Sequence, residues 1–162
     1  FKLGKLFPAV EYHDRWKTLT VSDFYTKPSY TWINPKKGYR KKTAVRPYEG
    51  GQYMVKNKRR EQIRPIQKFY LDKIVALCKE KGIPIVFFSV PSPDNWTYEK
   101  HNEIQRYAKA HGCTFWDLNL KVKKLKIDWK KDSYDGGDHL NNRGAKKVTT
   151  YMGKRLKKKF GL

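Results

Sequence analysis

The chain has 162 residues, of which 38% are hydrophobic and 15% aromatic, and its 37 Lys and Arg against 15 Asp and Glu give a formal net charge of +22. The length suits one domain, and the aromatic content excludes a simple disordered chain. The longest strongly apolar run covers residues 83–88, whereas a membrane-spanning helix needs about 20 residues. Transmembrane-bundle, collagen and coiled-coil classes are therefore excluded.

Residues 1–61 hold scattered Pro, Gly and aromatic residues with no sustained hydrophobic period. This composition predicts an irregular basic segment that packs on the rest of the fold. A short helix near 22–25, with Thr20 or Ser22 as its N-cap, is the regular element expected there. The chain opens at Phe1 without a Met, and we interpret it as an excised piece of a longer protein.

From residue 62 the pattern becomes regular. It predicts, in order, a helix, a strand, a helix, a strand and a helix over residues 65–81, 83–90, 97–111, 114–118 and 142–159. This order is typical of an α/β fold, here a three-layer sandwich with a mainly parallel, flavodoxin-like sheet that is incomplete at the N-terminus. The positions of the first helix expected to face the core are Ile66, Phe69, Tyr70, Ile74, Leu77 and Cys78.

The most informative stretch is residues 135–145, directly before the last helix. It places His139 between carboxylates on a Gly-rich loop. One carboxylate can accept the imidazole N–H while the other ring nitrogen takes a proton from a hydroxyl, so the stretch has the ingredients of a base and its orienting acid. Gly136 and Gly137 would permit the tight turn that this pairing needs. The alternative interpretation is a surface loop with Asn141 or Asn142 as N-cap.

Residues 135–149 resemble the last motif block of the SGNH (GDSL-like) hydrolases, in which an Asp and a His close in sequence complete a triad with a distant Ser. The His-Leu-Asn and Gly-Ala continuation resembles a cell-surface branch related to the lipoteichoic-acid D-alanylation protein and to polysaccharide O-acetylation proteins. Residues 12–16 and 69–96 are also similar to that branch. The resemblance implies that residues 62–162 are the C-terminal part of an SGNH-like domain, with His139 catalytic.

Two positions depart from the family pattern. The usual spacing is Asp-x-x-His, but position 136 is Gly, so the acid is either Asp135 or Asp138. We favour Asp135, because neighbouring side chains in an extended segment point to opposite sides. No Gly-Asp-Ser-like block is present, and the serines are Ser22, Ser29, Ser89, Ser92 and Ser133. Within this chain the candidate for a substitute nucleophile is Ser92, which follows the predicted strand 83–90. We expect the true one upstream of this chain, which by itself would be inactive.

The sequence also offers candidate substrate contacts and bears on the need for a cofactor. Asn95, which follows the first strand, could donate to an oxyanion, and Trp96 could form a wall against a sugar; turn chemistry and an aromatic anchor are the alternatives. His13, Arg15 and Trp16 could belong to a substrate-side loop or to a structural plug. No zinc pattern, P-loop or dinucleotide motif is present, so no metal or cofactor is expected.

The resemblance implies a cell-surface esterase or acyltransferase that acts on a glycan or teichoic-type polymer, with a membrane-bound acyltransferase as a further partner. It also implies a location on the extracellular face of the cell envelope, with a membrane anchor N-terminal to this chain. The basic surface would face the anionic polymer or the membrane. The alternatives are a non-catalytic polyanion-binding module, with nucleic acid the less favoured ligand, and a catalytically dead SGNH-like partner protein.

Overall fold

The computed structural model describes residues 39–161. The chain divides into two compact units, residues 1–40 and 41–162, and the fold described is that of the second unit. The short helix expected near residues 22–25, and the predicted site residues His13, Arg15 and Trp16, lie outside the described residues.

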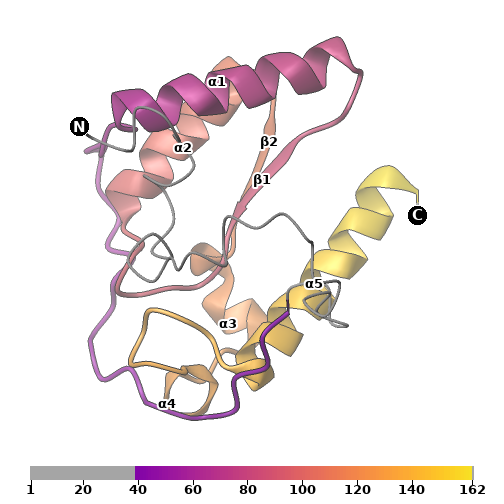
Figure 1. Cartoon of the computed structure of the whole chain (residues 1–162). Helices are drawn as coiled ribbons and strands as arrows, with labels where there is room; N and C mark the ends of the chain where they lie inside the picture. The colour runs from indigo at the N-terminus through magenta and orange to yellow at the C-terminus, as the bar shows by residue number, and fades with distance from the viewer. Residues whose placement is uncertain (1–38, 162) are drawn as a thin grey trace, which may run out of the picture. The chain divides into compact units, whose positions relative to one another are not determined.

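The larger unit contains α1 (Pro65–Glu80), β1 (Val86–Ser89), α2 (Tyr98–Ala110), β2 (Thr114–Asp117), η6 (Asn119–Lys121), α3 (Val122–Leu125), α4 (Trp129–Asp132) and α5 (Asn142–Phe160) (Figure 1). The two strands form a parallel sheet in which Val86 lies opposite Thr114 and Ser89 opposite Asp117. The five expected elements are confirmed, and the unit is a mixed α/β fold with a small parallel sheet. The short helices η6, α3 and α4 were not predicted.

Local sequence explains where the long helices begin and end. Pro65 opens α1, where a missing N–H costs nothing, and the Thr97 side chain caps α2 by accepting the Lys100 N–H at 3.3 Å. The Asn141 side chain caps α5, since its oxygen accepts the N–H groups of Arg143 and Gly144 at 3.0 and 3.2 Å. These caps fix the loops that flank the strands.

Apolar side chains pack against both faces of the sheet. On one face, a core cluster joins β2 to α3 and α5; its members are Trp116, Leu118, Leu125, Val148 and Met152. On the other face, the rings of Phe87 and Tyr107 meet at a centroid distance of 6.0 Å. Parallel strands are usually buried on both faces by the helices of their crossover connections, but β1 is only partly covered, since Phe88 is 54% exposed.

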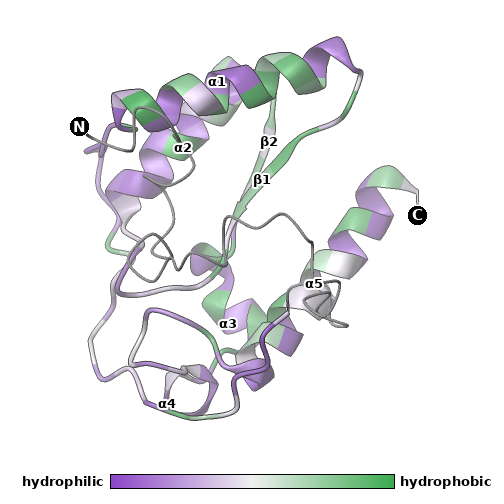
Figure 2. Cartoon of the chain, in the orientation of Figure 1, coloured by the Kyte–Doolittle hydropathy of each residue, from purple (hydrophilic) through white to green (hydrophobic). Residues whose placement is uncertain are grey.

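The prediction for the buried face of α1 was wrong. Val75, which lies on the opposite side of the helix, is the residue that is buried, at 1% exposure. Of the six residues expected to face the core, Cys78 is half-buried and the other five are between 48% and 55% exposed; these five are Ile66, Phe69, Tyr70, Ile74 and Leu77. Figure 2 shows hydrophobic and hydrophilic residues interleaved along this helix. α1 has apolar residues on two sides, so periodicity alone does not decide which side meets the core.

Within residues 39–161, no helix has both the length and the apolar composition needed to cross a membrane.

Candidate functional site

The loop between α4 and α5 folds back on itself. Ser133 and Leu140 form an isolated antiparallel bridge, and the Tyr134 N–H donates to the His139 carbonyl at 2.9 Å. Gly136 and Gly137 have φ angles of 89° and 130°, a region that L side chains rarely adopt. The loop therefore reverses within a few residues.

The reversal brings Asp135 to His139 at two points. Asp135 Oδ1 accepts the backbone N–H of His139 at 2.7 Å, and Asp135 Oδ2 lies 2.7 Å from the ring Nδ1. Asp138 Oδ2 lies farther from the same ring nitrogen, at 3.3 Å. The predicted pairing of Asp135 with His139 is thus present in the geometry, with Asp138 beside it.

The His139 side chain is 68% exposed. Among the described residues, its Nε2 atom makes no hydrogen bond, because the contacts of the ring with carboxylates all run through Nδ1. An imidazole held through Nδ1 with Nε2 open to a reactant is the arrangement that general-base catalysis requires.

The pKa of Asp135 lies below its ordinary value. Partial burial acts to raise it, but the hydrogen bonds that the carboxylate accepts from the backbone N–H and the ring of His139 outweigh burial and lower it. Asp135 is therefore ionised at neutral pH and can stabilise a positive charge on the imidazole.

The loop that follows β1 docks onto the His139 loop. Ser92 Oγ donates to the Asp138 carbonyl at 2.7 Å, and the Asp94 N–H donates to the Gly137 carbonyl at 3.3 Å. The Asn95 amide donates to Asp138 Oδ1 and, at 3.2 Å, to Ser92 Oγ. These contacts hold the Asp135–His139 pair beside the carboxyl end of β1, the edge where parallel α/β sheets bind ligands.

The same contacts define the surroundings of Ser92 and Asn95. Ser92 is buried and its hydroxyl is committed to the Asp138 carbonyl. The Asn95 side-chain amide, expected to serve an oxyanion, contacts Asp138 and Ser92 in this arrangement. Both residues hold the loop in place.

Sequence reasoning missed a buried polar network at the end of β2. Asp117 Oδ2 accepts the Trp96 indole N–H at 2.9 Å and lies 2.7 Å from His101 Nδ1. Asp117 Oδ1 accepts the Ser89 hydroxyl at 2.8 Å and both the backbone N–H and the amide of Asn119 at 2.9 Å. Polar residues placed immediately after an apolar strand run were the signal that could have revealed it.

Asn119 continues this network toward the His139 loop. Its Oδ1 accepts the Ser92 N–H and the Tyr53 hydroxyl, each at 3.0 Å. Burial, followed by the charge of Asp117, raises the pKa of Tyr53 well above its usual range, so Tyr53 remains a neutral donor. A continuous chain of hydrogen bonds therefore runs from Asp117 through Asn119 and Ser92 to Asp138.

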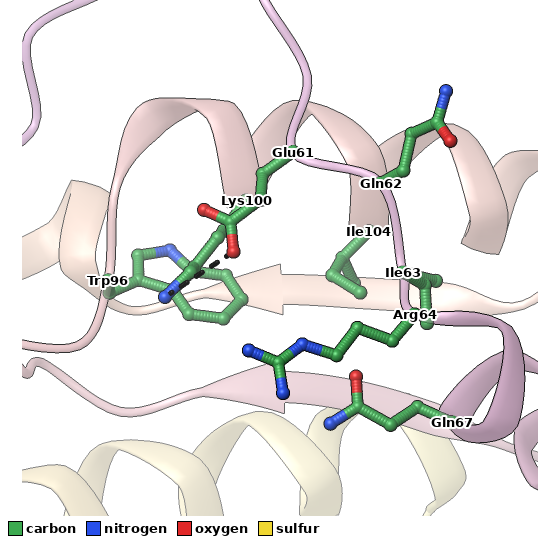
Figure 3. A pocket seen from close by; sticks show the side chains of 8 residues that line it. All are labelled: Glu61, Gln62, Ile63, Arg64, Gln67, Trp96, Lys100 and Ile104. Carbon is green, nitrogen blue, oxygen red and sulfur yellow. Dashed lines mark ion pairs between the residues drawn. The ribbon is translucent and has the colours of Figure 1, made fainter.

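A pocket of about 480 Å³ lies on the Trp96 side of the loop (Figure 3). It is lined by Glu61, Gln62, Ile63, Arg64, Gln67, Trp96, Lys100 and Ile104. Lys100 pairs with Glu61 at 3.8 Å, the dashed line in Figure 3, and donates to the Asn95 carbonyl at 2.8 Å. Trp96 therefore lines a pocket that is joined to the His139 loop through Asn95.

Asp135, Asp138 and His139 each offer one atom within 4.8 Å of the others that could ligate a metal ion. The ring Nδ1 that faces both carboxylates is the atom that the acid–base arrangement uses. The same three side chains can therefore serve in acid–base chemistry or ligate a divalent cation.

No protein-family model matches the chain, and neither a curated protein nor a solved structure matches it.

Proposed function

We propose that the chain is part of an SGNH-like esterase or acyltransferase, built on a three-layer α/β sandwich, that acts on a cell-surface glycan or teichoic-type polymer by Ser-His-Asp acyl transfer. The observation that supports the proposal most is the two-point contact of Asp135 with His139, which leaves Nε2 open. The resemblance of residues 135–149 to the SGNH motif block supports the same reaction type.

In the proposed reaction, a serine hydroxyl attacks the acyl carbon of the donor while His139 Nε2 takes its proton. The imidazolium formed keeps its Nδ1–H on Asp135, which stays ionised because its pKa is low. When the tetrahedral intermediate collapses, His139 returns the proton to the leaving alkoxide. Water or an acceptor hydroxyl then attacks the acyl-serine while His139 takes its proton, and collapse of the second intermediate releases the serine, whose oxygen recovers that proton from His139. Such proton transfers contribute about 10²–10⁴-fold in rate.

The serine that this reaction needs is expected outside residues 39–161. Of the serines in the described part, Ser89 is bonded to Asp117, Ser92 to the Asp138 carbonyl, and Ser133 accepts the Gly136 N–H. None of them has a hydrogen bond to His139. Each instead stabilises the strand ends or the loop that carries the pair.

Substrate contacts are proposed for the pocket side of the loop. Trp96 would form one wall against a sugar or polyol, and Asn95 would turn its amide to the oxyanion when substrate displaces its contact with Asp138. His13, Arg15 and Trp16 are proposed as further substrate contacts. No cofactor is required by this mechanism.

The proposed substrate corresponds to a location on the extracellular face of the cell envelope, with an anchor N-terminal to this chain and a membrane-bound acyltransferase as partner. The net charge of +22 favours an anionic polymer or membrane as the neighbouring surface. A catalytically dead partner protein is the competing proposal for the same fold.

A fluorophosphonate probe, which reacts covalently with base-activated serines, tests the proposal on the protein at its natural full length. We expect one serine to be labelled, the His139→Ala variant to lose the label, and the matched His111→Ala variant to keep it. A chelator should leave labelling unchanged. Absence of any labelled serine would favour the dead partner, and labelling that survives His139→Ala would contradict the proposal.

A further inference from the structure

A groove with a strongly basic lining lies between the η6–α3 segment and α5. It encloses about 570 Å³ and is lined by Lys121, Lys124, Tyr151, Lys154, Arg155 and Lys158. We call it the basic groove. Leu125 of α3 and Val148 of α5 pack together in the core beneath, so the two walls are held at a fixed separation.

The cations of the basic groove have no acidic counterpart among residues 39–161. The ion pairs described for this part of the chain engage other basic residues, such as Lys147 and Arg143 with the buried Asp132. Five positive side chains around one hollow repel one another, and this repulsion is relieved when an anion enters. A basic surface that served only solubility would not need to converge on a groove.

Arg155 is held in position before any ligand arrives. Its guanidinium lies 4.4 Å from the centroid of the Trp116 ring, and one of its nitrogens donates to the Tyr151 hydroxyl at 3.3 Å. Trp116 is a buried member of the core cluster and does not move freely. A fixed guanidinium loses little entropy on binding and matches two phosphate oxygens at once.

The groove offers no free aromatic surface for a nucleic-acid base. Tyr151 is its aromatic residue, and that ring is half-buried, with Lys124 Nζ 5.7 Å from its centroid and Arg155 on its hydroxyl. Binding of single-stranded nucleic acid usually combines cations with exposed rings on which bases stack. Here the phosphate contacts are present and the stacking surface is not.

We infer that the basic groove binds a linear phosphodiester polymer through its phosphates, without reading bases. Lys154 and Lys158 are four residues apart on one face of α5, and Lys121 and Lys124 are three apart on the opposite wall, so successive phosphates would meet cations from both sides. The inference deepens the proposed function, on which the choice of a phosphodiester polymer rests, by placing polymer binding in a groove that contains none of the residues proposed for catalysis.

Fluorescence anisotropy with two labelled probes tests the inference. One probe is an abasic phosphodiester oligomer, and the other is an oligo-dT of equal length. We expect similar affinity for both, and a loss of about 10-fold or more for the Lys121→Gln/Lys124→Gln/Lys158→Gln variant at physiological salt. The control is Lys79→Gln/Lys109→Gln/Lys146→Gln, which removes the same charge from exposed positions and should lose less than about 2-fold.

Arg155→Lys provides a second variant that preserves charge but removes the guanidinium fork, and it should weaken binding of both probes. Equal losses in the groove and control triple variants would overturn the inference, because binding would then depend on diffuse charge. Markedly tighter binding of oligo-dT would overturn it in favour of nucleic acid. Binding of both probes is measured without any ester substrate, so a failure of the acyl-transfer proposal leaves this test intact.

Discussion

The carboxylate of Asp135 contacts His139 at both its backbone and its ring, with each oxygen 2.7 Å from one nitrogen. A single acidic residue therefore sets the position of the loop and the direction of the imidazole at the same time. Asp138, adjacent to His139 in sequence, lies farther from the ring and also accepts the amide of Asn95. The geometry assigns the two acids different tasks.

Asp135→Asn should reduce kcat for ester turnover by about 100-fold or more, because an amide cannot stabilise the imidazolium as a carboxylate does. Asp138→Asn should reduce it much less, since Asp135 still orients the ring. Steady-state kinetics of the two variants in the full-length protein distinguishes them. A larger loss in Asp138→Asn would show that the roles of the two acids are reversed.

The titration of Asp135 should have its midpoint below the ordinary value of 3.8. Because folding lowers this pKa, the carboxylate stabilises the folded protein at pH values above 3.8, and this contribution is lost as the pH falls through the folded-state pKa. The His139 backbone amide, which Asp135 accepts, reports the transition by NMR. The signal should persist in Asp138→Asn and vanish in Asp135→Asn; a midpoint at or above 3.8 would contradict the described contacts.

Gly137→Ala should lower the free energy of unfolding by about 1–3 kcal/mol. A Cβ at this position would lie 2.7 Å from the Tyr48 ring, and the φ angle of 130° is unfavourable for alanine. Gly153→Ala is the matched control, because nothing lies within 4 Å of its Cβ inside α5 and alanine favours a helix by roughly 0.5–1 kcal/mol. Urea unfolding should give opposite signs, and equal signs would contradict the described loop.

Asp117→Asn should cost about 2–4 kcal/mol in unfolding free energy, because an amide nitrogen would face donors such as the Trp96 indole and the Ser89 hydroxyl. Asp94→Asn, at an exposed position, should change stability by less than about 0.5 kcal/mol. Denaturant unfolding followed by tryptophan fluorescence compares them. Similar small effects in both variants would show that the Asp117 network is not a stabilising feature.

Val75→Ala should destabilise the protein by about 1–3 kcal/mol, since Val75 is the buried residue of α1. Leu77→Ala should change stability by less than about 0.5 kcal/mol, because more than half of Leu77 is exposed. Thermal unfolding of the two variants measures the difference. The reverse order would restore the orientation of α1 that the sequence pattern predicted.

The sequence predicts where the long helices of this fold begin, but not which side of α1 is buried. Pro65, Thr97 and Asn141 are local signals, and they predict helix starts well because capping depends on adjacent residues. The side of α1 that meets the core depends on how the helix packs in the tertiary structure. Because apolar residues lie on both the Val75 side and the Leu77 side, the periodic pattern fits either orientation. The short helices η6, α3 and α4 contain too few residues for a repeating hydrophobic pattern to show in the sequence.

In the candidate site, too, the sequence predicts the local contact but not the long-range one. Asp135 and His139 are four residues apart, and two intervening glycines predict the turn that pairs them. The network of Asp117 with His101 joins residues 16 apart on different elements; the polar residues at the end of the second strand mark the place, but no local pattern identifies His101 as the partner. Long-range polar contacts depend on how the helices dock, which sequence periodicity does not specify.

The most direct test of the acyl-transfer proposal is turnover of an acetyl ester by the full-length protein and its His139→Ala variant. We predict a loss of at least about 100-fold in kcat/KM for His139→Ala, because the serine would have no base. His111→Ala, at the end of α2, should remain near the unmodified rate. Undiminished turnover in His139→Ala would contradict the assignment of His139 as the catalytic base.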